Sequence, residues 1–316
     1  MTTPEVSIVI PLFNEEAVIQ KLFDRIDSLL PTLPFSTEVV LVDDGSLDNT
    51  RELIRRKCLV DDRYSAVLLS RNHGHQIALS AGLTHARGSR GIMVMDGDLQ
   101  DPPELITSML EKLEEGYDVV YAVRKKRKES PFKRLLYWTY YRIQRSVSNF
   151  RIPLDSGDFG MMSRRVVDKL NNMPEQSRYL RGMRSWVGFR QFGLPYEREA
   201  RAAGETTYGF KQLLALAYNG IFNFSEFPVK FITRLGLYSI LISAIYLTYV
   251  LVRRIFYEDV PAGFTTLIIA IVLFSGVQLI SIGLLGEYVL RIYNQVRERP
   301  LFIVDKVIHG KVEKDG

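Results

Sequence analysis

The chain has 316 residues, of which 47% are hydrophobic and 24% are charged, and its formal net charge is +5. This hydrophobic content is ample for a large core. Cys58 is the only cysteine, which excludes an intramolecular disulfide and a cysteine-based zinc site and fits a reducing, cytosolic setting. Positive charge is concentrated in the run "RKKRK" at 124–128, which suits phosphates, anionic lipid, nucleic acid or a solvated loop alike.

The first 125 residues alternate short apolar runs with amphipathic segments. The apolar runs are typical of strands buried on both faces, and they lie at 6–11, 38–43, 65–69, 91–96 and 118–122. The segments between them predict helices at 16–30, 48–57, 75–86 and 102–115. We expect Asp101 to cap the last of these, with Pro102 and Pro103 in its first turn. The alternation predicts an α/β fold built on a mostly parallel sheet with right-handed crossovers.

Polar residues follow three of these strands, at the edge where such sheets bind ligands. They are Asn14 and Glu15, then Asp43 and Asp44, then the stretch "DGDLQD" at 96–101. Asp96 and Asp98 would share one face of an extended chain, with Gly97 between them to let a ligand approach. Clustered carboxylates repel one another unless a cation lies among them. Two carboxylates with open positions suit Mg²⁺ or Mn²⁺ bridging a diphosphate, and a solvated turn is the alternative interpretation.

Beyond residue 130 the pattern changes. Residues 131–149 predict an aromatic, basic helix, 159–163 a strand and 164–172 a helix. Residues 205–234 mix aromatic rings with basic side chains, which predicts interfacial amphipathic helices.

Two uncharged runs follow, 18 residues at 235–252 and 27 residues at 260–286. Each is about as long as the roughly 20 residues needed to span a bilayer, so we predict two transmembrane helices, with two buried helices of a soluble core as the alternative. The N-terminus has no basic, cleavable leader pattern. Basic residues lie before the first run and after the second, namely Lys230, Arg234, Arg291, Arg297, Arg299 and Lys306. This distribution favours a cytoplasmic location for both termini. Arg253 and Arg254, in the loop between the runs, favour the opposite orientation.

Five segments, which precede the two predicted spans in the chain, resemble the motifs of a known family. They are "VSIVIPLFNEE", "VDDGSLDNT", "DGDLQDPPE", "DSGDFGMMSRRVV" and "RAAGETTYGFKQLLALAYNGI". They resemble the family-2 glycosyltransferases of GT-A fold, a Rossmann-like fold. Within that family they are similar to the polyprenyl-phosphate sugar synthases, the group of dolichyl-phosphate mannose synthase and the bacteriophage-type GtrB glucosyltransferases.

The resemblance implies a set of residues that line or shape a nucleotide pocket: Pro11, Asn14, Glu15, Asp43, Asp44, Asp96 and Gly97. Asp44 would accept hydrogen bonds from a uracil N–H or ribose hydroxyls, and a helix-capping turn is the alternative role for this segment. The segment "RNHGHQIAL" resembles one that borders the donor pocket. For His73 and His75 we favour a structural role over metal binding, because no third ligand accompanies them.

The resemblance further implies that Asp96, Asp98 and Gln100 hold the metal, Mg²⁺ or Mn²⁺, and that Asp98 and Asp158 are catalytic. Asp158 matches the family's acceptor-side aspartate. A phosphate monoester has a second pKa of about 6 and is already largely dianionic at pH 7. We therefore expect Asp158 to orient the acceptor or sense the metal, with general-base catalysis as the alternative.

Arginines would neutralise the phosphates of donor and acceptor, and the candidates are Arg124, Arg198 and Arg201. One departure from the family pattern lies at 204–208, where "GETTY" has Thr207 in place of a lysine. Lys211 is a candidate for the missing phosphate contact.

These observations predict a membrane-bound, metal-dependent inverting glycosyltransferase that moves a hexose to undecaprenyl or dolichyl phosphate. The resemblance to the GtrB group implies glucose from UDP-glucose as the donor, with GDP-mannose or a UDP-amino sugar as alternatives. The rivals are a processive polysaccharide synthase, for which two spans are too few, and a silent nucleotide-sugar-binding membrane scaffold. Nucleic acid is not an expected partner, and the sequence leaves a homo-oligomer open.

The predicted organisation has four parts. A GT-A domain covers 1–204, interfacial helices 205–234, a two-helix transmembrane domain 235–290 and a cytoplasmic C-terminal tail 291–316.

Overall fold

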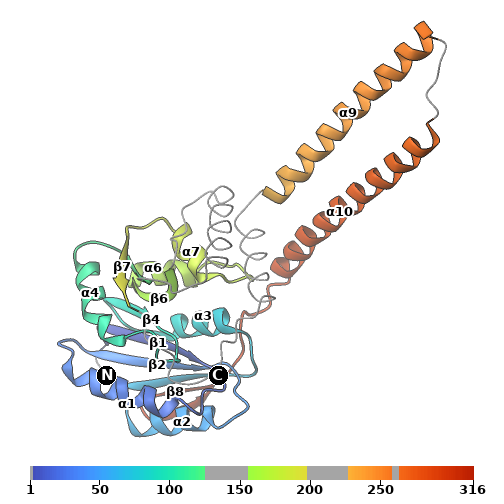
Figure 1. Ribbon diagram of the computed structural model, residues 1–316. Helices are drawn as coiled ribbons and strands as arrows, with labels where there is room; N and C mark the ends of the chain where they lie inside the picture. The colour runs from blue at the N-terminus through green and yellow to red at the C-terminus, as the bar shows by residue number, and fades with distance from the viewer. Residues whose placement is uncertain (1–2, 125–155, 198–226, 258–262) are drawn as a thin grey trace. The chain divides into compact units, whose positions relative to one another are not determined.

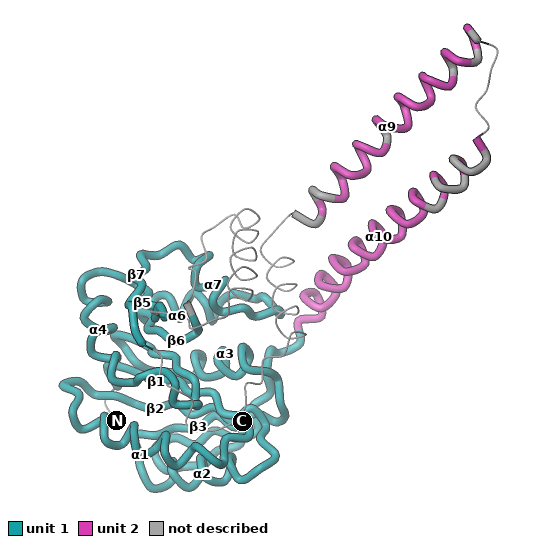
Figure 2. The backbone as a smooth tube through the Cα atoms, viewed as in Figure 1, with its two compact units in different colours: residues 1–146, 150–216, 299–316 teal, residues 147–149, 217–298 magenta. Residues whose placement is uncertain are grey.

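The structure is a computed structural model that describes residues 3–124, 156–197, 227–257 and 263–316 (Figure 1). The chain divides into two compact units (Figure 2). Unit 1 contains residues 1–146, 150–216 and 299–316, and unit 2 contains 147–149 and 217–298.

A single twisted sheet forms the centre of unit 1, with the strand order β7-β5-β6-β4-β1-β2-β3-β8-β9. The strands that the structure describes are β1 (Val6–Leu12), β2 (Thr37–Asp43), β3 (Tyr64–Leu69), β4 (Gly91–Val94), β5 (Val119–Arg124), β6 (Ser156–Ser163), β7 (Gln191–Tyr196), β8 (Val304–His309) and β9 (Val312–Asp315). The central strands β4, β1, β2 and β3 are parallel, whereas β6 runs antiparallel between β4 and β5, and β8 runs antiparallel to β3. The prediction of an α/β fold with a mostly parallel sheet is confirmed.

Helices cover both faces of the sheet, and β1 and its neighbours are therefore buried on both sides. The helices of unit 1 are α1 (Ile19–Leu29), α2 (Thr50–Val60), α3 (His75–His85), α4 (Ile106–Glu114), α6 (Arg164–Asn171) and α7 (Leu180–Trp186), with short 3₁₀ turns η1 (Leu30–Thr32) and η2 (Pro103–Leu105). Apolar residues of α1, α2 and α4 share one core cluster with alternate residues of β1 and β2, and α3 contacts the opposite face.

The predicted elements up to residue 124 are found with boundaries shifted by a few residues, and the strand and helix expected at 159–172 are found as β6 and α6. One local prediction is wrong. The side chain of Asp101 does not cap η2 or α4, neither of which has a side-chain cap hydrogen bond. Asp101 is instead 1% exposed and accepts a hydrogen bond from the Tyr196 hydroxyl at 2.6 Å. The predicted helix at 131–149 lies outside the described residues.

The segment expected to be a C-terminal tail contributes two strands to the sheet of unit 1. Strands β8 and β9 form a hairpin, called here the C-terminal hairpin (residues 304–315), that pairs with β3. Its turn contains Gly310 and Lys311, both with positive φ, as a two-residue hairpin turn requires. Both strands are short and mix charged residues with apolar ones, so their composition resembled that of a solvated tail.

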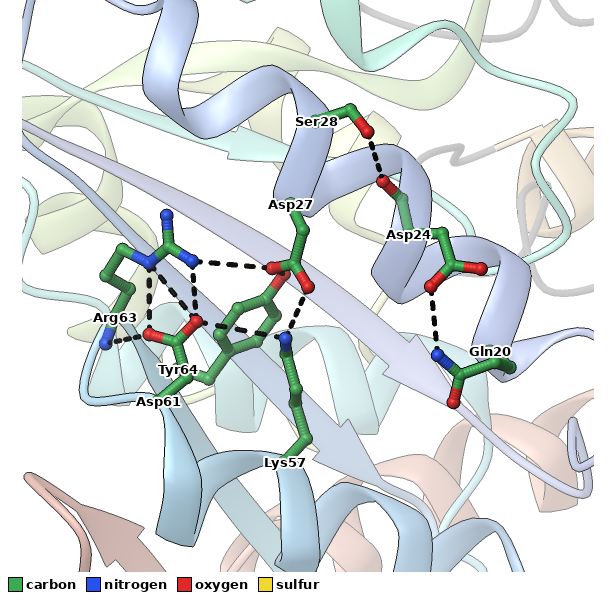
Figure 3. A network of polar contacts seen from close by, with 8 residues as sticks. All are labelled: Gln20, Asp24, Asp27, Ser28, Lys57, Asp61, Arg63 and Tyr64. Carbon is green, nitrogen blue, oxygen red and sulfur yellow. Dashed lines mark hydrogen bonds and ion pairs between the residues drawn. The ribbon is translucent and has the colours of Figure 1, made fainter.

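A polar network ties α1, α2 and β3 together at the amino end of β3 (Figure 3). Asp27 of α1 accepts hydrogen bonds from Lys57 Nζ at 2.5 Å and from the Tyr64 hydroxyl at 2.8 Å. Asp61 pairs with Arg63 at 2.6 Å, and Lys57 Nζ lies 4.5 Å from the centre of the Tyr64 ring. This network holds the edge of the sheet that is opposite to the carboxyl ends of the parallel strands.

Unit 2 contains two long helices, α9 (Phe227–Tyr257) and α10 (Phe264–Val296). Both are long and apolar enough to cross a membrane, with candidate spans at Ile232–Val250 and Leu273–Val296. Helix α9 includes the uncharged run at 235–252, and α10 includes residues 264–286 of the run at 260–286. Of the segment predicted to be interfacial, 205–226 lies outside the described residues and 227–234 begins α9, so the predicted domain boundaries stay a prediction.

Helix α3 packs so closely on the sheet that its middle requires glycine. A Cβ atom on Gly82 would overlap Val9 Cγ1 and lie 2.9 Å from Val42 Cγ2, both within the core. This close approach determines the position of the whole helix, whose first residues lie at the carboxyl edge of the sheet.

We predict that Gly82→Ala destabilises the protein even though alanine favours a helix. The gain in helix propensity is about 1 kcal/mol, whereas overpacking a core costs about 1–3 kcal/mol. Thermal or denaturant unfolding of the variant should show a net loss of stability. An unchanged or raised midpoint would mean that α3 moves away from the sheet at no cost.

Candidate active site

The carboxyl ends of β1, β2 and β4 bring the polar residues of three loops together at one edge of the sheet. β1 pairs with β2 on one side and with β4 on the other, with Leu12 opposite Asp43 and Val9 opposite Val94. Pro11 is buried within β1, and the loops with Asn14, Asp44 and Asp96 follow the three strands.

The turn after β2, residues 43–46, is built around a buried carboxylate. Asp43 is 0% exposed, its Oδ1 accepts a hydrogen bond from Ser46 N at 3.1 Å, and its Oδ2 lies 3.3 Å from Arg51 Nε. Gly45 has φ +71°, and a Cβ atom there would lie 2.5 Å from Asn72 N, so only glycine fits. Asp43 therefore shapes this turn from within, and its carboxylate offers no surface to a ligand.

Asn14 locks the loop after β1 to this turn. It adopts φ +54°, a conformation that asparagine tolerates better than most residues. Asn14 N donates to Ser46 Oγ at 3.0 Å, and Asn14 Oδ1 accepts from Leu47 N at 2.8 Å. Next to it, Glu15 N donates to Thr50 Oγ1 at 2.8 Å. Both predicted pocket loops are thus held together by backbone-to-side-chain hydrogen bonds.

Asp44 connects the same turn to the loop that leads into α3. Its two carboxylate oxygens accept hydrogen bonds from His73 N at 2.7 Å and Gly74 N at 2.9 Å. Burial raises the pKa of Asp44 above its usual value, and these two N–H groups offset part of that rise. A ligand N–H or hydroxyl at this position would use the remaining lone pair of each oxygen.

Asp96, His75 and Asp158 form the acidic centre of the edge. Strand β6 runs antiparallel to β4 with Gly160 opposite Val94, and continuing this register by two residues brings Asp158 opposite Asp96. His75 Nε2, at the start of α3, lies 3.6 Å from Asp96 Oδ1 and 3.6 Å from Asp158 Oδ2. The sequence analysis favoured a structural role for His75, and the structure places its ring inside the acidic centre.

The two carboxylates of this centre differ in their surroundings. The Asp96 side chain is 34% exposed, but its Oδ1 atom is buried and accepts no hydrogen bond from the residues that the structure describes. Desolvation of this group, against the opposing effect of His75, raises the pKa of Asp96 to about 6. Desolvation alone would also raise the pKa of Asp158, but Arg181, His75 and Arg184 outweigh it and hold that pKa well below its usual value.

Residues of α3 and α7 position Asp158. Gln76 Nε2 donates to Asp158 Oδ2 at 2.9 Å, while Gln76 Oε1 accepts from Leu180 N, at the start of α7, at 2.8 Å. Arg181 Nε lies 3.5 Å from Asp158 Oδ1. Arg184 is 4% exposed, and burial lowers its pKa to about 10.

Burial also affects His75, but its two acidic neighbours have the larger effect. Desolvation lowers the pKa of His75, whereas Asp158 and Asp96 raise it, and the result lies above the usual value for histidine. A positive charge on this ring is therefore favoured next to the two carboxylates.

The loop between β4 and η2 carries the second aspartate of the predicted metal motif. Asp98 Oδ1 accepts a hydrogen bond from Gln100 N at 3.1 Å, and Leu99 between them has φ +59°, a strained conformation for leucine. The space beside Gly97 is filled by Leu12, because a Cβ atom there would overlap Leu12 Cδ2. The absence of a side chain at Gly97 thus makes room for Leu12 of the protein. The sequence analysis had expected this room to be used by a ligand.

Of the predicted phosphate-binding arginines, the structure describes Arg124. It ends β5, and its Nε donates to the Tyr196 hydroxyl at 3.4 Å, so it lies beside the Tyr196–Asp101 pair. Arg198 and Arg201 lie outside the described residues, as do Thr207 and Lys211.

Sequence reasoning missed the residues that surround Asp158, namely Gln76, Arg181 and Arg184. The two arginines are three residues apart, so both lie on one face of α7, and this spacing in "RGMRSW" was the available signal. Gln76 directly follows His75 at the start of α3 and gave no separate signal.

Comparison with known proteins gives consistent results. The family model described as glycosyl transferase family 2 matches residues 7–170. YkcC of Bacillus subtilis (strain 168), an uncharacterized glycosyltransferase, is 42% identical over 301 residues, which are 95% of this chain and 93% of that protein. The SfII prophage-derived bactoprenol glucosyl transferase of Shigella flexneri is 35% identical over 307 residues, 97% of this chain and 99% of that protein.

Among solved structures, the mannosyltransferase PcManGT from Pyrobaculum calidifontis, in complex with GDP-Man and Mn²⁺, is similar with a TM-score of 0.47 and 19% identity. The match covers 65% of this chain and 59% of that chain.

The segment that matches the family model runs from β1 into α6 and contains Asp44, Asp96, Asp98 and Asp158. The relatives align along 95% and 97% of this chain, so the similarity is not confined to the segment that matches the family model. With its α/β sheet and this edge of buried carboxylates, the chain belongs to glycosyl transferase family 2 and has a GT-A-like fold.

Proposed function

We propose that this protein is a membrane-bound inverting glycosyltransferase that transfers glucose from UDP-glucose to a polyprenyl phosphate, undecaprenyl or dolichyl phosphate. The acidic centre of Asp96, His75 and Asp158 carries the chemical part of this proposal, because it places an ionised carboxylate and an open carboxylate at the ligand edge of the sheet. The lipid acceptor and the sugar rest on the relatives, of which several are named bactoprenol glucosyl transferases.

A divalent cation fits the residues of this edge only with help from the substrate. Within the described ranges, no group of three or more His, Cys, Asp or Glu side chains could hold a metal ion. Mg²⁺ commonly binds one or two carboxylates and takes its other ligands from water and substrate phosphates. The buried Asp96 Oδ1, which lacks a hydrogen bond to the described residues, together with Asp98 and Gln100, would supply the protein's share. Bound Mg²⁺ or Mn²⁺ would act as a Lewis acid toward the diphosphate.

Asp158 is better suited to position the acceptor than to remove a proton from it. A general base is most effective when its pKa is close to the working pH, and the pKa of Asp158 is held well below its usual range. Arg181 and Gln76 fix the orientation of the carboxylate. The phosphate oxygen of the lipid would attack the anomeric carbon, and the bond from that carbon to the diphosphate would break on the opposite face.

Helices α9 and α10 would anchor the protein in the membrane where its lipid acceptor resides. The basic residues outside the two spans favour a cytoplasmic location for the catalytic unit. The proposal is tested with membranes that contain the protein, supplied with labelled UDP-glucose, GDP-mannose and a UDP-amino sugar and with undecaprenyl or dolichyl phosphate. Labelled lipid from UDP-glucose is the expected product. Donor hydrolysis without labelled lipid, or no reaction with any donor, would contradict it.

We predict that Asp98→Asn keeps the fold and lowers turnover at least about 100-fold, which corresponds to about 2.7 kcal/mol in the barrier. The amide keeps an oxygen but removes the charge that a cation requires. EDTA should have the same effect on the unaltered protein. Asp24→Asn is the control, because Asp24 lies on the exposed side of α1 and interacts with Gln20 (Figure 3). Full turnover in EDTA would rule out the metal role.

We also predict that Mn²⁺ binding weakens as the pH falls through 6. The pKa of Asp96 is raised to about 6, so its carboxyl becomes protonated below that pH and loses its affinity for a cation. At pH 5 about one tenth of the group is ionised, so the affinity should be about tenfold lower than at pH 7.5. Electron paramagnetic resonance of free Mn²⁺ measures this without turnover. Equal affinity at the two pH values would show that Asp96 is not a ligand.

Asp158→Asn should lower the rate without removing it, and the pH profile should keep an inflection near the acceptor ionisation at about pH 6. The asparagine preserves the hydrogen bond to Gln76 but loses the ion pair with Arg181. The profile is measured as kcat/KM against pH for both proteins. An inflection that disappears in the variant would instead favour Asp158 as a general base.

A further inference from the structure

Arg51 joins three strands at the edge of the proposed donor site. It lies in the first turn of α2, and its side chain is 34% exposed. Its Nη2 donates to Leu69 O at the end of β3 at 3.1 Å and to Asp305 Oδ2 of β8 at 3.0 Å. Its Nε lies 3.3 Å from Asp43 Oδ2 at the end of β2. One guanidinium therefore connects the C-terminal hairpin to the turn at 43–46.

Asp43 depends on this guanidinium. Its side chain is 0% exposed, and Arg51 is the one cation with which it forms an ion pair among the residues that the structure describes. Removing one partner of a buried ion pair leaves the other charge uncompensated, and the remaining group then moves or takes up a proton. Either response would change the carboxylate that accepts the hydrogen bond from Ser46 N.

From Asp43 the contacts continue into both pocket loops. Ser46 accepts a hydrogen bond from Asn14 N through its Oγ, and Asn14 Oδ1 accepts one from Leu47 N. Asp44, which holds the loop before α3, directly follows Asp43. A change at Arg51 would thus reach the loops after β1 and β2 through a continuous series of contacts that runs by way of Asp43 and Ser46.

The C-terminal hairpin is held to α2 by a second, independent contact. Arg55 Nε lies 2.7 Å from Glu313 Oε2 of β9, and Lys306 Nζ lies 2.8 Å from the other oxygen of Glu313. Arg55 is one helical turn after Arg51 and contacts the same hairpin, but its ion pairs are with Glu52 and Glu313 and do not include Asp43. The chain therefore contains a matched control for Arg51.

We propose that Arg51 is a positioning residue for the nucleotide of the donor, and that the C-terminal hairpin forms part of the donor site by holding Arg51 through Asp305. This inference rests on the proposed function, because it takes the turn at 43–46 and the loop of Asn14 as the nucleotide pocket. It gives the residues after α10 a role in donor binding besides their place in the sheet.

The test compares Arg51→Gln, Arg51→Lys, Asp305→Asn and the control Arg55→Gln in the full-length protein. UDP affinity is measured by calorimetry with Mn²⁺ and no acceptor. Hydrogen exchange of residues 43–47 is measured without nucleotide, so that it reports on the turn even if no nucleotide binds. Thermal unfolding of all four variants measures the stability that each loses.

Arg51→Gln should weaken UDP binding by about tenfold and speed hydrogen exchange in the turn, because coupling within one ion-pair network is commonly of this size. Arg51→Lys should restore part of the affinity, since the ammonium can still face Asp43. Asp305→Asn should have a smaller effect of about two- to threefold, because Asp305 is 47% exposed and such pairs are weak. Arg55→Gln should leave both affinity and exchange close to those of the unaltered protein.

Equal losses of affinity in Arg55→Gln and Arg51→Gln would overturn the inference, because they would reflect general loosening of the hairpin. Unchanged affinity and exchange in Arg51→Gln would also overturn it while leaving the proposed function standing. If the unaltered protein bound no nucleotide, the proposed function would fail and with it the role of Arg51 in donor binding, whatever the exchange data showed about the turn.

Discussion

Aspartate carboxylates gather at the carboxyl edge of the sheet in unit 1, and an ionised carboxylate can stay there only where cations or hydrogen-bond donors face it. Asp43 is compensated by Arg51 and Ser46 N, and Asp44 by two backbone N–H groups. Asp158 is compensated by Gln76 and Arg181. The loops of this edge take their conformations from these interactions, which bring parts of the chain that are distant in sequence into contact.

Asp96 differs from the other three, and this difference gives the edge its chemistry. Its buried oxygen accepts no hydrogen bond from the described residues, and its pKa is raised, whereas that of Asp158 is lowered. Neighbouring carboxylates whose environments push their pKa values apart are suited to different roles. In the proposed function, Asp158 would stay ionised and fixed by the protein, and Asp96 would bind a cation that a substrate phosphate shares.

Particular elements explain how far the sequence could be interpreted. Strands β1 and β2 were predictable because each is a continuous apolar run followed directly by polar residues. The C-terminal hairpin was missed because its short strands mix charged and apolar residues and contain no long apolar run, so their composition resembles that of a solvated tail. Asp101 was misassigned because "DPPE" has the pattern of a helix start, while Tyr196, its partner, lies 95 residues further along the chain.

The sequence by itself determined the order of the strands and helices up to residue 124, the strand and helix at 159–172, the three polar loops that end the parallel strands, and the two long apolar segments, because each depends on local pattern. Only the tertiary structure decided which residues compensate the buried carboxylates. His75 and Gln76 reach Asp158 from α3, Arg181 reaches it from α7, and Asp305 of β8 meets Arg51. These contacts join residues separated by 23 to 254 positions, and no local periodicity encodes them, because they arise from the order in which the strands pair.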